Sequence, residues 1–147
     1  MHFNGGMSDL PDPEMMRTTC IAQTLRRAAR AATRRYEAAL RPLGLTIGQF
    51  TLLAALDRPE PMPRGVLADA LGMDRTTLTR DVAPLERRGL VLSAPMKDDG
   101  RARGLSLTPT GRGLLAGAAP AWAAAQARAE ADLGASWPDL KALLAKL

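Results

Sequence analysis

Apolar residues near the start of the chain recur at steps of three and four, the period of an amphipathic helix. The run begins near Glu14 and stops at Gly44, a residue type that readily adopts the left-handed conformation ending many helices. Its apolar face consists of Ile21, Leu25, Ala28, Ala32, Tyr36, Ala39 and Leu43. The pattern therefore predicts one long helix over residues 14–43, preceded by a disordered tail over residues 1–13.

The middle of the chain predicts three short helices with recognisable ends. Thr46 opens the first with a capping-box pattern, and the Pro-rich residues 57–65 after it are expected to form a loop. The second short helix ends at Gly72. The third starts after Asp74 as its N-cap and ends at Gly89, which suits the left-handed position beyond a helix.

This third helix contains residues that do not favour helix formation, and it also has strong end signals. Leu78, Val82 and Leu85 form its buried stripe, and Leu90 can contact Leu85 in a Schellman end. Pro84 removes one backbone hydrogen bond and is interpreted as a determinant of shape without a part in recognition. The threonines and arginines at its start therefore indicate selection for something other than helix stability.

The last third of the chain predicts a β-hairpin followed by two helices. The strands are expected over residues 90–94 and 105–108, separated by the polar, glycine-containing stretch PMKDDGRARG. A long helix starts after Thr108, and a short Leu-rich helix follows Ser136, which with Asp139 forms a second capping pattern. The fold class is therefore mainly α with a small β-hairpin.

Composition narrows the function. The chain of 147 residues carries a net charge of +5, which suits a polyanion such as nucleic acid. Cys20 is the single cysteine and His2 the single histidine, so neither a disulfide framework nor a metal site is predicted. No apolar run is long enough for a membrane span, no signal peptide is recognised, and a cytoplasmic location is expected. We expect no cofactor and no enzymatic activity, because no nucleophile–base pair or carboxylate dyad stands out.

A short helix, a tight turn at Gly72, a second helix and a hairpin form the layout of a winged helix-turn-helix, whose second helix enters the DNA major groove. Short hydroxyl side chains at the helix start can approach phosphates or a thymine methyl, and Arg80 can bind guanine or phosphate. Arg75 suits a backbone contact. The candidate positions on this helix are Arg75, Thr76, Thr77, Thr79 and Arg80.

The hairpin tip adds a second candidate DNA contact. Lys97, Arg101 and Arg103 form a positive finger suited to the minor groove. Asp99 can hold an arginine in position through a bidentate pair. The alternative is a solvated, mobile hairpin tip without a role in binding, and the DNA-reading helix that precedes the hairpin argues against it.

Three motifs, GLTIGQFTLLAAL, LADALGMDRTTLTRDVAPLERRGLV and DDGRARGLSLTPTGRGLL, resemble the core of the MarR family of bacterial transcription regulators. The resemblance implies one MarR-like domain over residues 14–147, with a winged helix over about 46–110 and dimerisation helices over about 14–43 and 109–147. It also implies a homodimeric repressor that binds an inverted-repeat operator in double-stranded DNA. The resemblance also implies roles for single residues. The family's base- and backbone-reading positions are matched by Thr76, Thr77, Thr79 and Arg80, and its wing motif is matched by Asp99 and Arg101.

The sequence leaves two points undecided, the signal that releases the protein from DNA and an alternative function. The resemblance implies release from DNA either by a small anionic or aromatic effector or by oxidation of a cysteine. Cys20 is the candidate thiol, but it lies about two residues upstream of the expected position, which turns the side chain by roughly 200° and favours a structural thiol. A winged helix used for protein–protein contact, without DNA binding, is the alternative function, although Thr and Arg on the second helix argue against it.

Overall fold

The computed structural model describes residues 10–98 and 100–147, and the chain forms two units, residues 1–34 and 35–147. The described part of the first unit contains α1 (Pro13–Thr19) and the start of α2 (Ile21–Leu40). The single helix predicted over residues 14–43 is therefore wrong in three places. The chain is helical from Pro13, Cys20 breaks the helix with an extended ψ of 117°, and residues 41–43 form a 3₁₀ turn in place of α-helix.

Hydroxyl side chains form hydrogen bonds to the backbone just before the break at Cys20. The Thr18 and Thr19 hydroxyls donate to the Glu14 and Met15 carbonyls, at 2.9 and 2.7 Å. Such side-chain bonds and β-branching both weaken a helix end, whereas the apolar period continues past it. Asp12 caps α1 by accepting from the Met15 N–H at 2.8 Å, so the expected disordered tail does not extend to residue 13. Residues 1–9 of that predicted tail lie outside the described residues.

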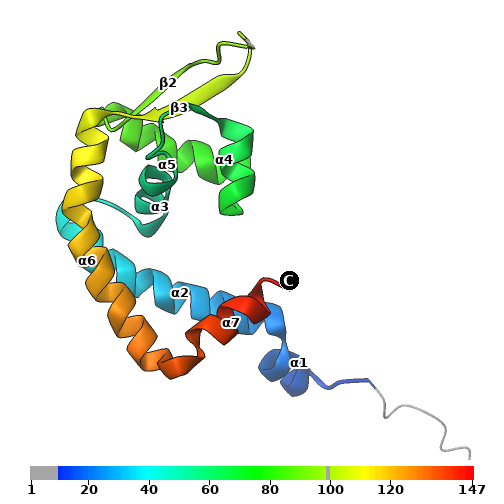
Figure 1. Ribbon diagram of the computed structural model, residues 1–147. Helices are drawn as coiled ribbons and strands as arrows, with labels where there is room; N and C mark the ends of the chain where they lie inside the picture. The colour runs from blue at the N-terminus through cyan, green and yellow to red at the C-terminus, as the bar shows by residue number, and fades with distance from the viewer. Residues whose placement is uncertain (1–9, 99) are drawn as a thin grey trace, which may run out of the picture. The chain divides into compact units, whose positions relative to one another are not determined.

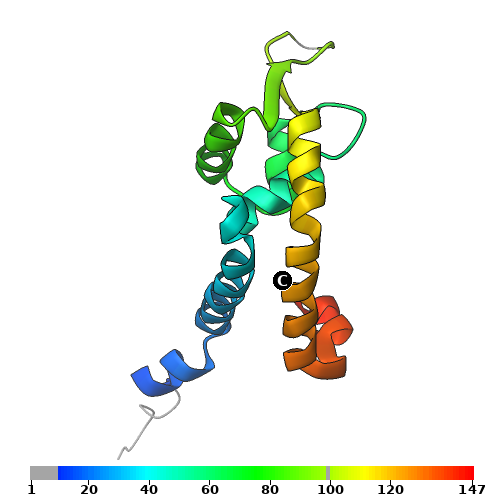
Figure 2. The same ribbon diagram turned by 90° about the vertical axis from the view of Figure 1, so that its left-hand side faces the viewer.

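The second unit contains the rest of α2 and all later elements. They are a 3₁₀ turn (Arg41–Leu43), α3 (Ile47–Ala55), β1 (Met62–Pro63), α4 (Arg64–Leu71), α5 (Arg75–Arg87), β2 (Val91–Pro95), β3 (Arg103–Leu107), α6 (Pro109–Leu133), a 3₁₀ turn (Gly134–Ser136) and α7 (Trp137–Leu144). Figure 1 shows the hairpin of β2 and β3 extending beyond α4 and α5, and Figure 2 places this wing at the end where α6 begins. The mainly α fold with a hairpin wing is therefore confirmed.

The sheet has three antiparallel strands in the order β1–β3–β2, one more than predicted. Val91 pairs with Leu107 across the hairpin, and Met62 pairs with Leu105 on the other side of β3. Met62 lies in the stretch that was expected to be a loop, yet its side chain is buried. Two prolines flank it in sequence and hide the strand signal, because proline is poorly suited to a strand interior.

The core lies between α3, α5, α6 and the sheet. The predicted stripe of α5 is confirmed, since Leu78, Val82 and Leu85 are at most 2% exposed. Phe50 of α3 stacks on Trp122 of α6, with ring centroids 6.0 Å apart. The fully buried leucines are Leu40, Leu52, Leu53, Leu56, Leu67, Leu78, Leu85 and Leu105.

Most predicted helix ends are also confirmed. Thr46 forms a capping box with Gln49, and Gly44 adopts a φ of 66°. At the end of α5, the Leu90 N–H donates to the Leu85 carbonyl at 2.9 Å, as a Schellman motif requires. The capping pattern at Ser136 is wrong, because its side chain makes no capping hydrogen bond at the start of α7. Ser136 is already the last residue of a 3₁₀ turn, and its helical backbone does not suit an N-cap.

The last turns of the chain expose apolar side chains. Leu133, Leu143, Leu144 and Leu147 are 42, 58, 38 and 81% exposed.

Within the described residues, no single helix is long and apolar enough to cross a membrane. One bent pair of helical segments, residues 21–43 with 47–55, has the length and composition for it and nothing more.

Candidate DNA-binding surface

The start of α5 separates an exposed polar side from the buried stripe. The Thr77 N–H donates to the Asp74 carboxylate at 2.7 Å, and this cap fixes where the helix begins. Leu78 then faces the core, and Thr77 is half-buried. The predicted DNA-contacting residues that lie exposed here are Arg75, Thr76, Thr79 and Arg80.

The Asp74 cap is anionic at neutral pH. The backbone N–H of Thr77 donates to its carboxylate and lowers the pKa of Asp74, with smaller contributions from Thr76 and the positive charge of Arg80. A negative charge at this end also suits the helix dipole. The exposed side of α5 therefore starts from a well-defined first turn.

The wing supplies the second group of predicted residues, but one of them is placed differently than expected. Lys97 and Arg101 are exposed in the turn between the strands. Arg103 was expected at the tip and is instead the first residue of β3, where it donates to the Ser93 carbonyl at 3.0 Å and to the Ser93 hydroxyl at 3.3 Å. The strands extend further toward the tip than predicted, which places Arg103 at their side. Asp99 lies outside the described residues.

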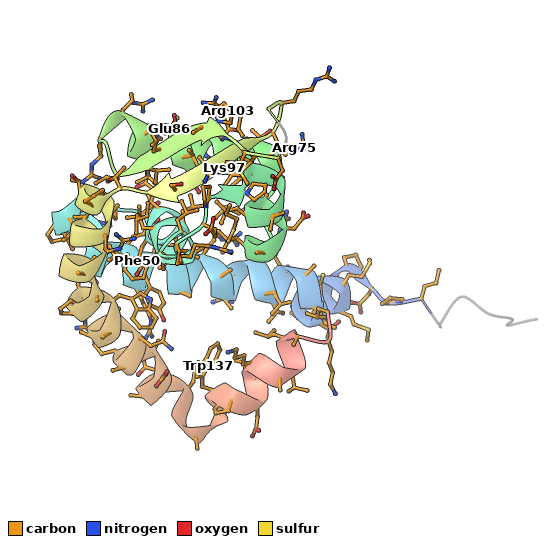
Figure 3. The ribbon with its side chains drawn as sticks, turned by 45° about the horizontal axis from the view of Figure 1, so that its top comes forward. Phe50, Arg75, Glu86, Lys97, Arg103 and Trp137 are labelled. Atoms are coloured by element: carbon orange, nitrogen blue, oxygen red, sulfur yellow. The ribbon has the colours of Figure 1, made fainter. Side chains whose placement is uncertain are left out.

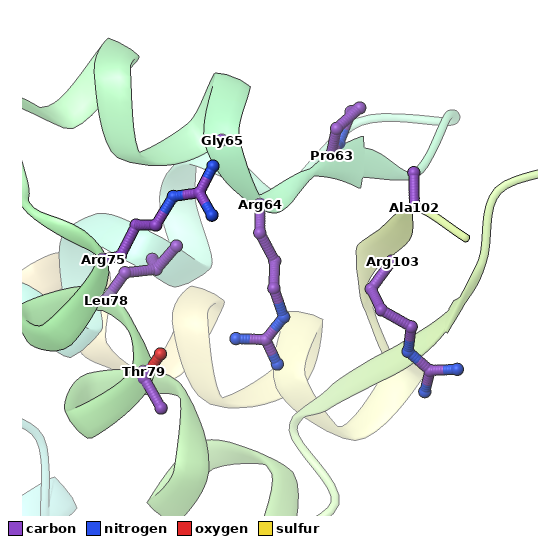
Figure 4. Close-up of a pocket in the computed structure, with 8 residues that line it drawn as sticks. All are labelled: Pro63, Arg64, Gly65, Arg75, Leu78, Thr79, Ala102 and Arg103. Carbon is purple, nitrogen blue, oxygen red and sulfur yellow. The ribbon is translucent and has the colours of Figure 1, made fainter. Parts of the chain in front are cut away.

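A cleft of about 370 Å³ separates α5 from this side of the wing. Figure 4 shows the Arg64 side chain between those of Arg75 and Arg103, and Figure 3 shows Arg75, Arg103 and Glu86 in the same part of the lobe, away from Phe50. The lining residues are Pro63, Arg64, Gly65, Arg75, Leu78, Thr79, Ala102 and Arg103. Among the residues that the structure describes, all charged side chains that line the cleft are therefore arginines.

Two arginines that the sequence analysis did not single out hold α5 in place. Arg64, the first residue of α4, donates to Glu86 of α5 at 2.9 Å. Arg88, just beyond α5, donates to the Gly44 and Leu43 carbonyls at 2.8 and 3.1 Å. These partners lie far apart in sequence, so no local pattern indicates them.

The root of the wing is tied to the start of α6. The Thr108 hydroxyl donates to the Gly89 carbonyl at 2.7 Å and accepts from the Gly111 N–H at 3.0 Å. A Cβ on Gly111 would lie 2.1 Å from the Leu90 carbonyl oxygen. Gly111 therefore serves close packing between the start of α6 and the segment that follows α5.

Comparisons with known proteins decide the family. The MarR family model matches residues 45–102. The transcriptional regulator MosR of M. tuberculosis, in complex with DNA, is 38% identical, with a TM-score of 0.78; the match covers 86% of this chain and 92% of that one. The chain belongs to the MarR family.

Further MarR-like structures agree with this assignment. The transcriptional repressor CouR bound to a 23-mer DNA duplex is 28% identical over 92% of this chain and 98% of that chain, with a TM-score of 0.78. CouR from Rhodococcus jostii RHA1 bound to p-coumaroyl-CoA is 27% identical over 74% and 77%, with a TM-score of 0.65. A search of curated protein sequences found no match. As a MarR-family member, the chain is a winged-helix transcriptional regulator and not an enzyme.

The remaining candidate chemistry lies outside the winged helix. Cys20 is exposed at the junction of α1 and α2. Among the residues that the structure describes, no group of three or more His, Cys, Asp or Glu side chains could hold a metal ion. The charged surface of α5 and the wing is therefore the candidate functional site of this MarR-family chain.

Proposed function

We propose that this MarR-family chain binds an inverted-repeat operator in double-stranded DNA as a homodimer and represses transcription in the cytoplasm. The observation that carries the proposal is the exposed row of Arg75, Thr76, Thr79 and Arg80 at the capped start of α5, beside a wing with Lys97 and Arg101. α5 enters the major groove with its first turns, and the wing reaches the adjacent minor groove.

The roles of these residues follow from their chemistry. Arg80 reads a guanine edge, because its guanidinium can donate two parallel hydrogen bonds to O6 and N7. Arg75 and the threonines position the helix on the backbone, with Thr77 contributing less because it is half-buried. Arg101 enters the minor groove, and Asp99, which belongs to the same wing motif, orients it.

Apolar surface that one chain leaves exposed supports the proposed homodimer. Leucines of α7 and its flanks, with exposures from 38 to 81%, would lie in water in a monomer. Apolar side chains exposed together on a few turns of chain are typical of protein interfaces. The domain division of the sequence analysis, with dimerisation helices over about 14–43 and 109–147 and a winged helix over about 46–110, is part of this proposal.

An anionic or aromatic small molecule is the proposed signal for release. A cleft of about 490 Å³ between α2 and α6 contains Arg35, which pairs with Asp132 at 2.5 Å, and Arg128. Alanines from both helices supply the rest of its wall, so it combines apolar surface with positive charge. CouR, a relative, binds p-coumaroyl-CoA, which supports an effector with an anionic group.

Selection of bound sequences from a random DNA pool tests the proposal. We expect enrichment of an inverted repeat whose half-site centres lie about 10–10.5 bp apart, or a multiple of that spacing. Binding without enrichment of any sequence would contradict an operator-specific regulator. A single, unrepeated half-site would contradict the homodimer.

A further inference from the structure

We propose that Arg64 binds a DNA phosphate in the cleft between α5 and the wing, and that Glu86 positions it. The inference deepens the proposed function, on which it rests, by naming a contact at the start of α4 that sequence reasoning did not single out. Arg75 and Arg103 line the same cleft on either side of Arg64 (Figure 4).

The position of the cleft determines what passes over it. When a helix lies in the major groove and a wing in the adjacent minor groove, the strand that separates the two grooves passes between them. In this chain the space between α5 and the wing is the cleft, with Arg64 projecting from the start of α4. The phosphates of that strand therefore lie closest to Arg64, Arg75 and Arg103.

The charges in the cleft favour this contact. Three arginines line a space of about 370 Å³, and Glu86 is the carboxylate paired with one of them. Their positive charge attracts an anion, and a phosphate bound in this space would be stabilised by it. The cleft is consequently better suited to a polyanion than to water alone.

The Arg64–Glu86 pair leaves the guanidinium able to bind phosphate. Arg64 Nη2 donates to Glu86 Oε1 at 2.9 Å, with side-chain exposures of 32 and 37%. A guanidinium carries five N–H donors in a planar fork, so a second acceptor can be bound without breaking this bond. Glu86 thus reduces the freedom of Arg64 before DNA arrives, which lowers the entropy lost on binding.

The alternative is that Arg64 and Glu86 merely join α4 to α5, and matched variants separate the two roles. Arg64→Ala removes the guanidinium and the ion pair. Glu86→Gln removes the charge of the partner but keeps Arg64 and an oxygen that can accept its hydrogen bond. Arg112→Ala is the control. Arg112 pairs with Asp57 at 3.0 Å, and so joins α6 to the segment that follows α3, but it does not line the cleft.

The test measures the affinity of the full chain for its selected operator across a series of salt concentrations. For Arg64→Ala we expect binding weaker by about tenfold or more, as for removal of a hydrogen bond to a charged group. The slope of log K against log salt should fall by about 0.9 for each phosphate that the variant no longer neutralises. Glu86→Gln and Arg112→Ala should keep the wild-type slope, because neither change removes a group that neutralises a phosphate. Glu86→Gln should weaken binding, but by less than Arg64→Ala, because the amide oxygen of Gln holds Arg64 less firmly than the carboxylate.

A scan of the operator with single methylphosphonates locates the phosphate that Arg64 binds. Neutralising one phosphate per half-site, between those bound by α5 and by the wing, should weaken wild-type binding and leave Arg64→Ala unaffected. Equally weakened binding by Arg64→Ala and Glu86→Gln would show a structural role and overturn the inference, as would an Arg64→Ala variant that binds like wild type. A wild-type chain that enriches no DNA sequence would instead overturn the proposed function, and this inference with it.

Discussion

Replacing Gly111 by alanine should destabilise the protein, although alanine normally favours a helix. The new Cβ would lie 2.1 Å from the Leu90 carbonyl oxygen and 2.7 Å from Leu107 Cδ1. The first neighbour is backbone and cannot rotate away, so the start of α6 has to move from the end of α5. That movement strains the Leu90 carbonyl's hydrogen bond with the Thr108 N–H, which is 3.1 Å long.

The loss of stability in Gly111→Ala is the sum of opposing contributions. Overpacking costs about 1–3 kcal/mol, and a weakened backbone hydrogen bond costs about 1 kcal/mol. Alanine recovers about 0.5–1 kcal/mol of helix propensity. The free energy of unfolding should therefore fall by about 2 kcal/mol, which lowers the melting temperature by about 4–8 °C for a chain of this size.

Gly113 provides a matched control two residues further along α6. A Cβ there would meet nothing within 4 Å, so Gly113→Ala should raise the melting temperature slightly through helix propensity alone. Both variants and wild type are compared by thermal unfolding at one protein concentration, because association of chains changes apparent stability. If Gly111→Ala were as stable as Gly113→Ala, the close approach between α6 and Leu90 would be refuted.

Three further changes test the wing, the cap of α5 and the thiol. Arg101→Ala should weaken operator binding and lower the salt slope by about 0.9 for each phosphate no longer neutralised, and an unchanged slope would exclude Arg101 from the interface. Asp74→Ala should lower the melting temperature at pH 7, because Asp74 caps α5. Because folding lowers the pKa of Asp74, this stabilisation is present above its ordinary pKa and is lost as pH falls through the folded value. The difference in melting temperature between variant and wild type should therefore become smaller below about pH 4. A difference that stays constant with pH would contradict the charged cap. Peroxide should leave operator binding by wild type and Cys20→Ser equally intact if release depends on a small molecule, whereas weaker binding confined to wild type would assign sensing to the thiol.

Local signals in the sequence were sufficient to predict the features that depend on residues close together in the chain. The capping box at Thr46, the Asp74 cap and the left-handed Gly89 each involve residues within one turn, and each is confirmed. The buried stripe of α5 likewise follows from its period. These features include the helix that carries most of the candidate DNA-contacting residues.

The features that sequence reasoning missed depend mainly on contacts between distant segments. β1 is two residues long and exists because β3 pairs with it, a partner that no pattern around Met62 indicates. The ties made by Arg64 and Arg88 join α5 to distant parts of the chain, so sequence showed their charge but not their partners. The break at Cys20 is local, but the apolar period continues across it, and the hydroxyl hydrogen bonds beside it leave no mark on that period.

The effect of Arg80 on the preference for operator over unrelated DNA tests most directly whether α5 reads the operator. The affinity for the selected operator is divided by the affinity for a scrambled duplex of equal length, at one salt concentration, for wild type and Arg80→Ala. We expect the variant to bind the operator about 1–3 kcal/mol more weakly and the scrambled duplex almost as well as wild type, so that the ratio falls about fivefold or more. A ratio equal to that of wild type would contradict the assignment of α5 as the element that reads the operator.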